Sequence, residues 1–407
     1  MARARAHGTK RGALAAGLRQ LSFEDLARRV ASSAQGPDPS VYANALFGVV
    51  LALMAIGFLV QASHAATIQG VDDYHGELVS QALFRVGGIA ALAVGYRFGP
   101  SGVRRFLPLL MVAACLMLIA VYVPGLRAEV NGSKRWLKLG ALTFQPSEVA
   151  RVVLVLWVAD RCTRLGESLQ GFRRGVLPML LASFVFFGLV LGETDLGGSL
   201  LLLLCALMVM WVGGAQFRSV AVPAIVVGGG AIAGLAAFIP YVRHRIAVFF
   251  HQAQNDQVSD TYNAIAHGGP LGVGIGNGPF RNAGVPYLDS DYVFAQLGEE
   301  LGVFGMFVVL GLALSFMWFA LRLVLSLRDR YDGLCAFGLL ISVCLQGMIH
   351  CQVVARLAPS KGMTLPFISD GGTSLIVSSL AVGLALGAAR RVHQENLSCN
   401  PSNATAS

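Results

Sequence analysis

The chain has 407 residues, of which 55% are hydrophobic and only 13% are charged. Soluble globular domains carry roughly 25% charged residues, so the composition excludes an ordinary soluble protein and indicates that lipid surrounds most of the chain. The formal net charge is +9, but the basic residues are scattered between apolar runs without interleaved aromatic residues, which argues against nucleic acid as a partner.

Three parts of the chain differ in character. Residues 1–40 are basic and lack the apolar core and cleavage site of a signal peptide, so we expect a cytoplasmic N-terminal extension. Leucines in it recur at near-helical spacing beside arginines, and a basic amphipathic helix on the inner leaflet or a partly disordered tail fits this pattern equally well. Residues 41–391 are predicted to form a polytopic membrane domain, and residues 392–407 a cytoplasmic C-terminal tail.

Apolar runs of the roughly 20 residues that a helix needs to cross a bilayer occur about ten times. They do not alternate polar and apolar residues as the strands of a membrane β-barrel do. The sequence therefore predicts an all-α integral membrane protein with about ten transmembrane helices. The runs begin near Val41, Leu78, Phe106, Ser147, Gly175, Leu196, Val220, Gly302, Leu334 and Gly371.

Lysine and arginine counts in alternate loops predict the orientation of these helices. About twenty lie on the side of the N-terminal tail and about nine on the opposite side. Both termini are therefore predicted to be cytoplasmic, which places residues 124–146, 240–296 and 353–370 outside. The middle segment is too long for a simple connector, and it forms the predicted extracytoplasmic loop between helices 7 and 8.

The first external segment continues into the next helix and reads NGSKRWLKLGALTFQPSEVAR, which combines cations, a tryptophan and a helix start. Pro146 is predicted to be the first helical residue, and Glu148 and Arg151, three positions apart, share one face of that helix. A tryptophan anchored at the membrane interface and a helix-end ion pair explain these residues as well as a binding site does. The candidate ligand-binding residues here are Arg135, Trp136, Lys138, Gln145, Glu148 and Arg151.

The segment GETDLGG places Glu193 and Asp195 in a short external turn between two apolar runs. Carboxylates two positions apart do not share a helix face, which disfavours a catalytic pair. A helix cap, or an ion pair with Arg135 or Arg151, is the favoured role of Asp195.

The segment VPYLDSDYVFAQLGEELG places Asp289 and Asp291 just outside another apolar run. Loss of water at such a boundary raises the pKa of a carboxyl group, which suits it to accept a proton from a sugar hydroxyl. A helix N-cap is the alternative role of Asp291.

The last external segment reads PSKGMTLPFISDGGTS. Lys361 supplies a cation, and Ser369 precedes a glycine pair at a predicted helix start. Backbone N–H groups at Gly371 and Gly372 could bind phosphate oxygens, although a glycine pair is more often a simple turn. The seven cysteines of the chain lack the paired spacing of a metal site, so these residues predict none.

Five segments, in this order, resemble the FtsW/RodA/SpoVE family, and together they span roughly residues 41–391. The sequence KGMTLPFIS is closer to the division branch of the family than to the elongation branch. The five segments are NGSKRWLKLGALTFQPSEVAR, GETDLGGSLLL, AHGGPLGVGIGNG, SDYVFAQLGEELG and PSKGMTLPFISDGGTS.

The resemblance implies an inverting glycosyltransferase of the bacterial inner membrane that polymerises lipid II during cell division. The C4 hydroxyl of one GlcNAc would attack C1 of a MurNAc carried on undecaprenyl pyrophosphate. The family's catalytic aspartate corresponds to Asp291, which would act as general base. Arg135 and Lys361 would neutralise the leaving diphosphate, with Lys138 and Arg151 as further candidates.

The resemblance also implies partners and a location. These are the nascent glycan strand, a class B penicillin-binding protein similar to FtsI, other division proteins, and the lipid of the membrane at the division septum. Two alternatives remain open on the residues: a transporter that flips lipid II, and a membrane scaffold that recruits the transpeptidase.

Two residues depart from the family pattern. Asp289 stands where the family has histidine, which leaves the choice of base between Asp289 and Asp291 open. Asp370 stands where the family has tyrosine. No cofactor is fixed by the resemblance: Asp370 either binds a divalent cation, Mg²⁺ or Mn²⁺, or pairs with Lys361. The ion pair is favoured because the negative charge of Asp370 needs neutralisation in every state.

Overall fold

A computed structural model of the protein describes residues 38–68, 71–130, 133–139, 142–238, 243, 256–282, 288–355, 357–358 and 362–398. Several sequence predictions lie outside these residues: the structure of the N-terminal extension up to residue 37, part of the segment 240–296, the position of Lys361, and the C-terminal tail beyond residue 398.

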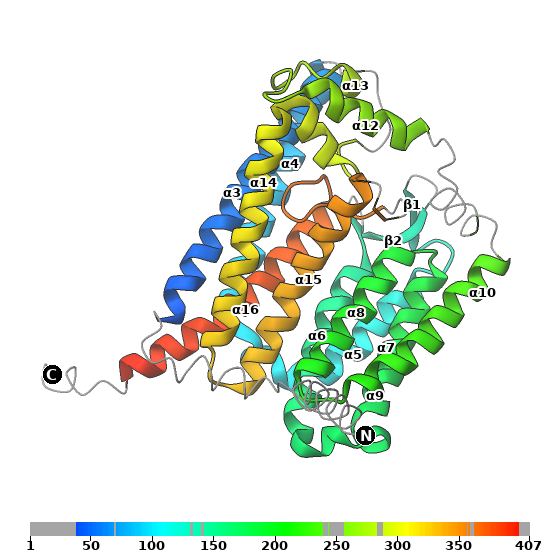
Figure 1. The fold of residues 1–407 in the computed structure, drawn as a ribbon, viewed down its shortest axis with the longest axis vertical. Helices are drawn as coiled ribbons and strands as arrows, with labels where there is room; N and C mark the ends of the chain where they lie inside the picture. Colours follow the sequence, from blue (N-terminus) through cyan, green and yellow to red (C-terminus); the bar gives the residue numbers. More distant parts are fainter. Residues whose placement is uncertain are drawn as a thin grey trace, which may run out of the picture.

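Long α-helices form most of the described chain (Figure 1). Short 3-10 and π turns join several of them: η1 (Arg104–Phe106), η2 (Gly166–Gln170), η3 (Phe172–Val176) and η4 (Ala224–Gly229). The helices are α3 (Pro39–Ile68), α4 (Val71–Val103), α5 (Leu107–Ala120), α6 (Pro146–Leu165), α7 (Leu177–Gly192), α8 (Leu196–Val212), α9 (Phe217–Pro223), α10 (Gly230–Phe238), α12 (Asp256–Gly268), α13 (Pro279–Asn282), α14 (Val293–Ser326), α15 (Arg330–Val354) and α16 (Gly372–Ser398).

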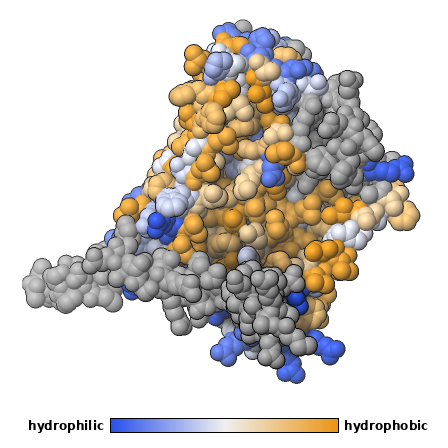
Figure 2. Space-filling model, in the orientation of Figure 1, coloured by the Kyte–Doolittle hydropathy of each residue, from blue (hydrophilic) through white to orange (hydrophobic). Residues whose placement is uncertain are grey.

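Within the described residues, seven helical stretches are long and apolar enough to cross a membrane. One of them, Tyr74–Ala120, includes both α4 and α5, and α8 is a shorter apolar helix. Figure 2 shows apolar residues over the middle of the visible face and hydrophilic residues at both ends. The predicted α-helical integral membrane fold is confirmed, while the total of about ten spans and the loop between helices 7 and 8 remain predictions.

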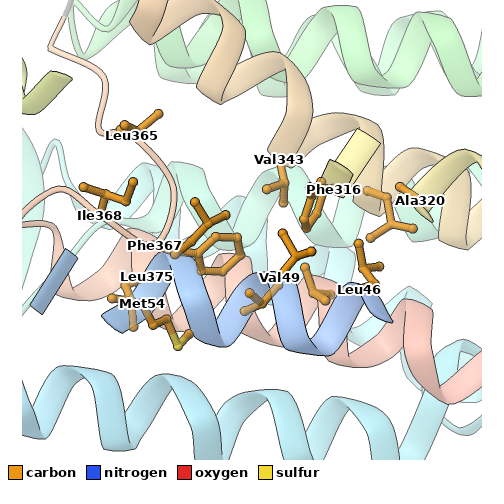
Figure 3. Packing of buried hydrophobic residues seen from close by; sticks show 14 of the residues in the cluster. Leu46, Val49, Met54, Phe316, Ala320, Val343, Leu365, Phe367, Ile368 and Leu375 are labelled. Atoms are coloured by element: carbon orange, nitrogen blue, oxygen red, sulfur yellow. The ribbon is translucent and has the colours of Figure 1, made fainter. Parts of the chain in front are cut away.

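The helices gather in two groups with α15 between them (Figure 1). One hydrophobic core joins α3, α14, α15 and α16, and a second joins α5, α6, α7 and α8 to α15 and α16. Residues 365–368, which lie between α15 and α16, enter the first core. There the Phe367 ring points toward Phe316, with ring centroids 6.4 Å apart (Figure 3).

A small antiparallel sheet precedes α6 and consists of β1 (Arg127–Val130), β2 (Ser133–Leu139) and β3 (Leu142–Phe144). These strands were not predicted from the sequence, which indicated a helix start only at Pro146. Side chains alternate across a strand, so Arg135 and Leu137 share one face of β2 and Trp136 and Lys138 the other. Because Leu137 is buried and Lys138 is exposed, the first of these faces is directed toward the protein.

Candidate active site

The Asp291 carboxylate lies next to the chain that leads from α15 to α16. Helix α14 begins at Val293, and its N-cap residue is Tyr292, with no side-chain cap bond. The expected alternative for Asp291, an N-cap of this helix, is therefore wrong. A Cβ atom added to Gly362 would lie 3.2 Å from Asp291 Oδ2, so a residue without a side chain permits this close approach. Asp291 is half-buried.

Asp289 faces helix α3 instead. Its Oδ2 atom lies 3.9 Å from Nε2 of His64, and its Oδ1 atom is 3.4 Å from the hydroxyl of Ser290. Its main-chain carbonyl accepts the N–H of Asp370 at 3.1 Å. The two candidate bases thus differ in surroundings: Asp289 contacts α3, and Asp291 contacts Gly362.

Asp370 has polar neighbours on α4. Burial raises the pKa of its carboxyl group above the ordinary value, and the charges of Asp289 and Glu77 add to this rise. A hydrogen bond from the Gln81 side chain and the nearby guanidinium of Arg85 act in the opposite direction. The predicted pair with Lys361 concerns a residue outside the described chain.

These surroundings do not fit a bound Mg²⁺ or Mn²⁺ ion. Among the described residues, no three His, Cys, Asp or Glu side chains converge as metal ligands.

Arg135 and Asp195 form a second polar cluster at the N-terminal end of α8. Arg135 Nη1 lies 3.5 Å from Asp195 Oδ1, and Arg135 Nη2 donates to the carbonyl of Thr194 at 3.2 Å. Asp195 also accepts the N–H of Gly198 at 2.9 Å as the N-cap of α8, and Gln145 Nε2 is 3.4 Å from its other oxygen. Both roles predicted for Asp195, a cap and a partner of Arg135, are confirmed.

The helix start predicted at Pro146 is confirmed, since α6 begins there. Arg151 Nη2 lies 2.6 Å from Glu148 Oε2, as the spacing of three residues predicts. The Arg151 side chain is only 5% exposed. Its Nε atom, like Nε of Arg135, is buried without a hydrogen-bond partner among the described residues. Each guanidinium therefore has one buried N–H that no described residue satisfies.

The predicted glycine pair starts α16, where Gly372 is the first helical residue. A Cβ atom at Gly372 would come within 2.3 Å of the Phe84 ring, and one at Gly371 within 2.8 Å of Thr364. Close packing thus explains both glycines without an anion. Next to them, Thr373 Oγ1 donates to the carbonyl of Thr143 at 3.1 Å. This bond joins α16 to strand β3, and so connects the sheet that carries Arg135 to the chain around Asp370.

Two polar residues of α15 bind the segment that leads from α15 to α16. Gln346 Nε2 donates to the carbonyl of Thr364 at 3.2 Å and to the hydroxyl of Ser374 at 3.0 Å. Nδ1 of His350 lies 2.8 Å from the carbonyl of Met363. Both side chains are buried and serve as partners of these polar groups.

The glycine-rich segment packs against the start of α14. A Cβ atom at Gly268 would lie 2.0 Å from the carbonyl of Gly298, and one at Gly272 would lie 2.2 Å from that of Glu300. The fully buried Glu299 accepts the N–H of Phe280 at 2.8 Å. The glycines allow two backbones to touch, so this motif supports the helix that follows Asp291.

Several polar residues of the site were not predicted from the sequence. Gln61 and His64 on α3 and Gln81 on α4 lie inside or beside long apolar runs, where only their polarity distinguishes them. The position of Glu193 in a turn was predicted, but its burial was not. Glu193 is 4% exposed, and neither of its oxygens has a hydrogen-bond partner among the described residues.

Burial raises the pKa of Glu193 to about 9, with a further increase from the charge of Asp195 and a decrease from Arg135. Glu193 is therefore neutral near pH 7. The following residue, Thr194, has a φ of 63°, a conformation that is uncommon for a β-branched residue and marks local strain.

Comparison with known proteins identifies relatives along nearly the whole membrane portion. Residues 43–394 match the family model FtsW/RodA/SpoVE, described as cell cycle protein. A probable peptidoglycan glycosyltransferase FtsW from Thioalkalivibrio sulfidiphilus is 35% identical over 368 residues, which cover 86% of this chain and 89% of the relative. The protein with the same description from Aromatoleum aromaticum is 32% identical over 363 residues, covering 85% and 88%.

Solved structures give the same result. A chain from a structure described as "Structural coordination of polymerization and crosslinking by a peptidoglycan synthase complex" aligns with a TM-score of 0.70 and 25% identity, covering 86% of this chain and 98% of its own. The rod shape determining protein RodA of Thermus thermophilus aligns with a TM-score of 0.61 and 25% identity, covering 85% and 95%.

Proposed function

Because the chain belongs to the FtsW/RodA/SpoVE family of cell cycle proteins, we propose that it is a peptidoglycan glycosyltransferase that polymerises lipid II and releases undecaprenyl pyrophosphate. Its relatives that share 32% and 35% identity are named as enzymes of this kind. The structural observation that carries the proposal is the position of the half-buried Asp291 carboxylate, directly before the first turn of α14 and beside Gly362, where an added Cβ atom would lie 3.2 Å from it.

In the proposed reaction, Asp291 takes the proton from the C4 hydroxyl of the acceptor GlcNAc. The hydroxyl oxygen forms a bond to C1 of the donor MurNAc, and the bond from C1 to the pyrophosphate oxygen breaks with inversion. A carboxylate that is partly removed from water is a stronger base than one in solution, and a positioned base contributes roughly 10²- to 10⁴-fold to such a step.

Arg135 and Arg151 are the described cations proposed to receive the diphosphate, and each has a buried Nε–H without a partner among the described residues. Negative charge grows on the leaving group in the transition state, and oriented cations stabilise it. Lys138 is exposed on the other face of β2, so it is a candidate for binding the substrate before it enters the site. Lys361, directly before Gly362, remains the other proposed cation.

We further propose a class B penicillin-binding protein similar to FtsI as partner, within a larger set of division proteins. The related synthase complex is described as coordinating polymerization and crosslinking, and crosslinking is the reaction of such a partner. The proposed location is the division septum, with both termini in the cytoplasm. A multi-pass membrane protein suits a substrate whose polyprenyl chain stays in lipid.

Polymerisation of purified lipid II by the full chain with its transpeptidase partner tests the function. We expect glycan strands from wild type, a loss of at least about 100-fold for Asp291→Asn, and activity within a few-fold of wild type for Asp289→Asn. Thermal unfolding and partner binding should be unchanged in both variants. A loss confined to Asp289→Asn would assign the base to that residue. Full activity of Asp291→Asn would support a flippase or scaffold instead.

A further inference from the structure

Two segments that are distant in sequence meet on the outer end of α3. Residues 288–292 precede α14 and contain Asp291, and residues 362–371 precede α16. The Gln61 amide lies between them: its Nε2 atom is 2.8 Å from the carbonyl of Asp289 and 3.3 Å from that of Ile368. A primary amide has two hydrogens to donate, so Gln61 binds both segments at once. Gln61 is only 2% exposed.

Two further bonds join the segments to each other. The hydroxyl of Ser369 donates to the carbonyl of Ser290 at 2.7 Å and accepts the N–H of Leu365 at 2.8 Å. The N–H of Asp370 donates to the carbonyl of Asp289 at 3.1 Å. The hydroxyl hydrogen of Ser369 is thus engaged within the protein, which gives this residue a structural task.

The second segment needs such support, because its backbone is strained. Phe367 has a φ of 69°, which an L residue adopts only when its surroundings enforce it. A Cβ atom at Gly57 of α3 would lie 2.5 Å from the carbonyl of Phe367, so the segment rests directly on the helix backbone. Figure 3 shows the Phe367 ring within the hydrophobic core.

We propose that Gln61 and Ser369 are positioning residues for Asp291. Together they bind the carbonyls of the two residues before Asp291 and fix the backbone from which its carboxylate reaches Gly362. This inference rests on the proposed function. Displacement of a reacting group by about 1 Å can lower a rate by roughly 100-fold, so these bonds act on turnover more than on substrate binding.

The chain offers a matched control in Gln296. Its side chain is fully buried, and its Nε2 atom donates to the carbonyl of Val60 at 3.2 Å. The bond joins α14 to α3, one residue from Gln61, and has the same chemistry. It holds a helix to a helix, however, and binds neither the Asp289 nor the Ile368 carbonyl. Methionine has nearly the shape of glutamine without a donor, so Gln61→Met and Gln296→Met remove comparable bonds.

The test measures kcat and KM for lipid II with the full chain and its transpeptidase partner. We expect Gln61→Met to lower kcat by about tenfold or more with KM within about twofold of wild type. Gln296→Met should keep kcat within about twofold. Both variants should lose similar thermal stability, because each loses the two hydrogen bonds of a buried Nε2 atom. Ser369→Ala, a smaller change, should also lower kcat and leave KM unchanged.

A normal kcat for Gln61→Met and Ser369→Ala, an equal loss in Gln296→Met, or a rise in KM that accounts for the effect would each overturn the inference. Should Gln61→Met fail to fold, Ser369→Ala decides alone. Wild type and Asp291→Asn are measured in parallel. An inactive wild type or an active Asp291→Asn would overturn the proposed function and this inference with it. An active wild type, an inactive Asp291→Asn and an unimpaired Gln61→Met would overturn this inference only.

Discussion

The guanidinium of Arg135 and the carboxylate of Asp195 lie 3.5 Å apart and join strand β2 to the first turn of α8. The same carboxylate accepts the N–H of Gly198 at 2.9 Å and caps that helix. One side chain therefore starts a membrane helix and also orients a cation that we propose to face the diphosphate. The two tasks can be separated by substitution.

Asp195→Asn keeps a side-chain oxygen for the cap and removes the charge, whereas Asp195→Ala removes both. Loss of an N-cap costs about 1 kcal/mol, so we expect the alanine variant to unfold at a lower temperature than the asparagine variant. Both should polymerise lipid II more slowly, because Arg135 loses its anionic partner. Equal stability of the two variants would mean that the cap contributes nothing, and normal rates would separate Arg135 from the reaction.

Glu193 should make the protein less stable as the pH rises. Its pKa is raised from 4.5 to about 9 in the fold, so between these values the folded state holds a proton that the unfolded state has lost. Stability then falls with increasing pH by up to about 1.4 kcal/mol per pH unit. Glu193→Gln, which is neutral throughout, should be more stable than wild type at pH 8, and this advantage should shrink toward pH 5.

The exposed Glu167 provides the control for this measurement. Thermal unfolding of wild type, Glu193→Gln and Glu167→Gln is compared between pH 5 and pH 8 in the same detergent. We expect Glu167→Gln to follow wild type. A difference between wild type and Glu193→Gln that does not change with pH would show that Glu193 is not protonated in the folded protein.

Local patterns in the sequence were sufficient to predict most helices and several contacts within them. The runs expected near Val41, Leu334 and Gly371 correspond to helices that begin at Pro39, Arg330 and Gly372, because apolar length alone decides which segments cross lipid. The Glu148–Arg151 pair and the Asp195 cap were predictable for a similar reason: helix geometry fixes which residues meet within one turn.

Contacts between distant segments could not be predicted in this way. Gln61 binds the carbonyl of a residue 228 positions later in the chain, and nothing around Gln61 in the sequence encodes that partner. Neutral Glu193 depends on burial that arises only when the helices assemble. The three-stranded sheet before α6 was also missed, since its strands are short and their pairing depends on the turns between them.

Gly57 tests whether the segment before α16 must rest on α3. An added methyl group would lie 2.5 Å from the carbonyl of Phe367 and 2.7 Å from Cα of Ile368, so Gly57→Ala should push this segment outward. Overpacking typically costs 1–3 kcal/mol, and we expect a loss of about this size together with a lower polymerisation rate.

Gly48, on the same helix, has nothing within 4 Å of an added methyl group. Gly48→Ala should therefore change stability by less than about 1 kcal/mol and keep the rate. Equal behaviour of the two variants would contradict the close contact.

Gly272 tests the support that the glycine-rich segment gives to α14. It has a φ of 82°, and an added Cβ atom would lie 2.2 Å from the carbonyl of Glu300. Gly276 has a similar φ of 88°, but an added Cβ atom there would meet open space. Alanine at either position carries the same backbone strain of about 1–2 kcal/mol, so the difference between Gly272→Ala and Gly276→Ala isolates the contact with Glu300. We expect Gly272→Ala to unfold at a clearly lower temperature and to polymerise lipid II more slowly, because a displaced α14 start would move Asp291. If both variants lose the same stability, the glycine-rich segment does not hold the start of α14 in place.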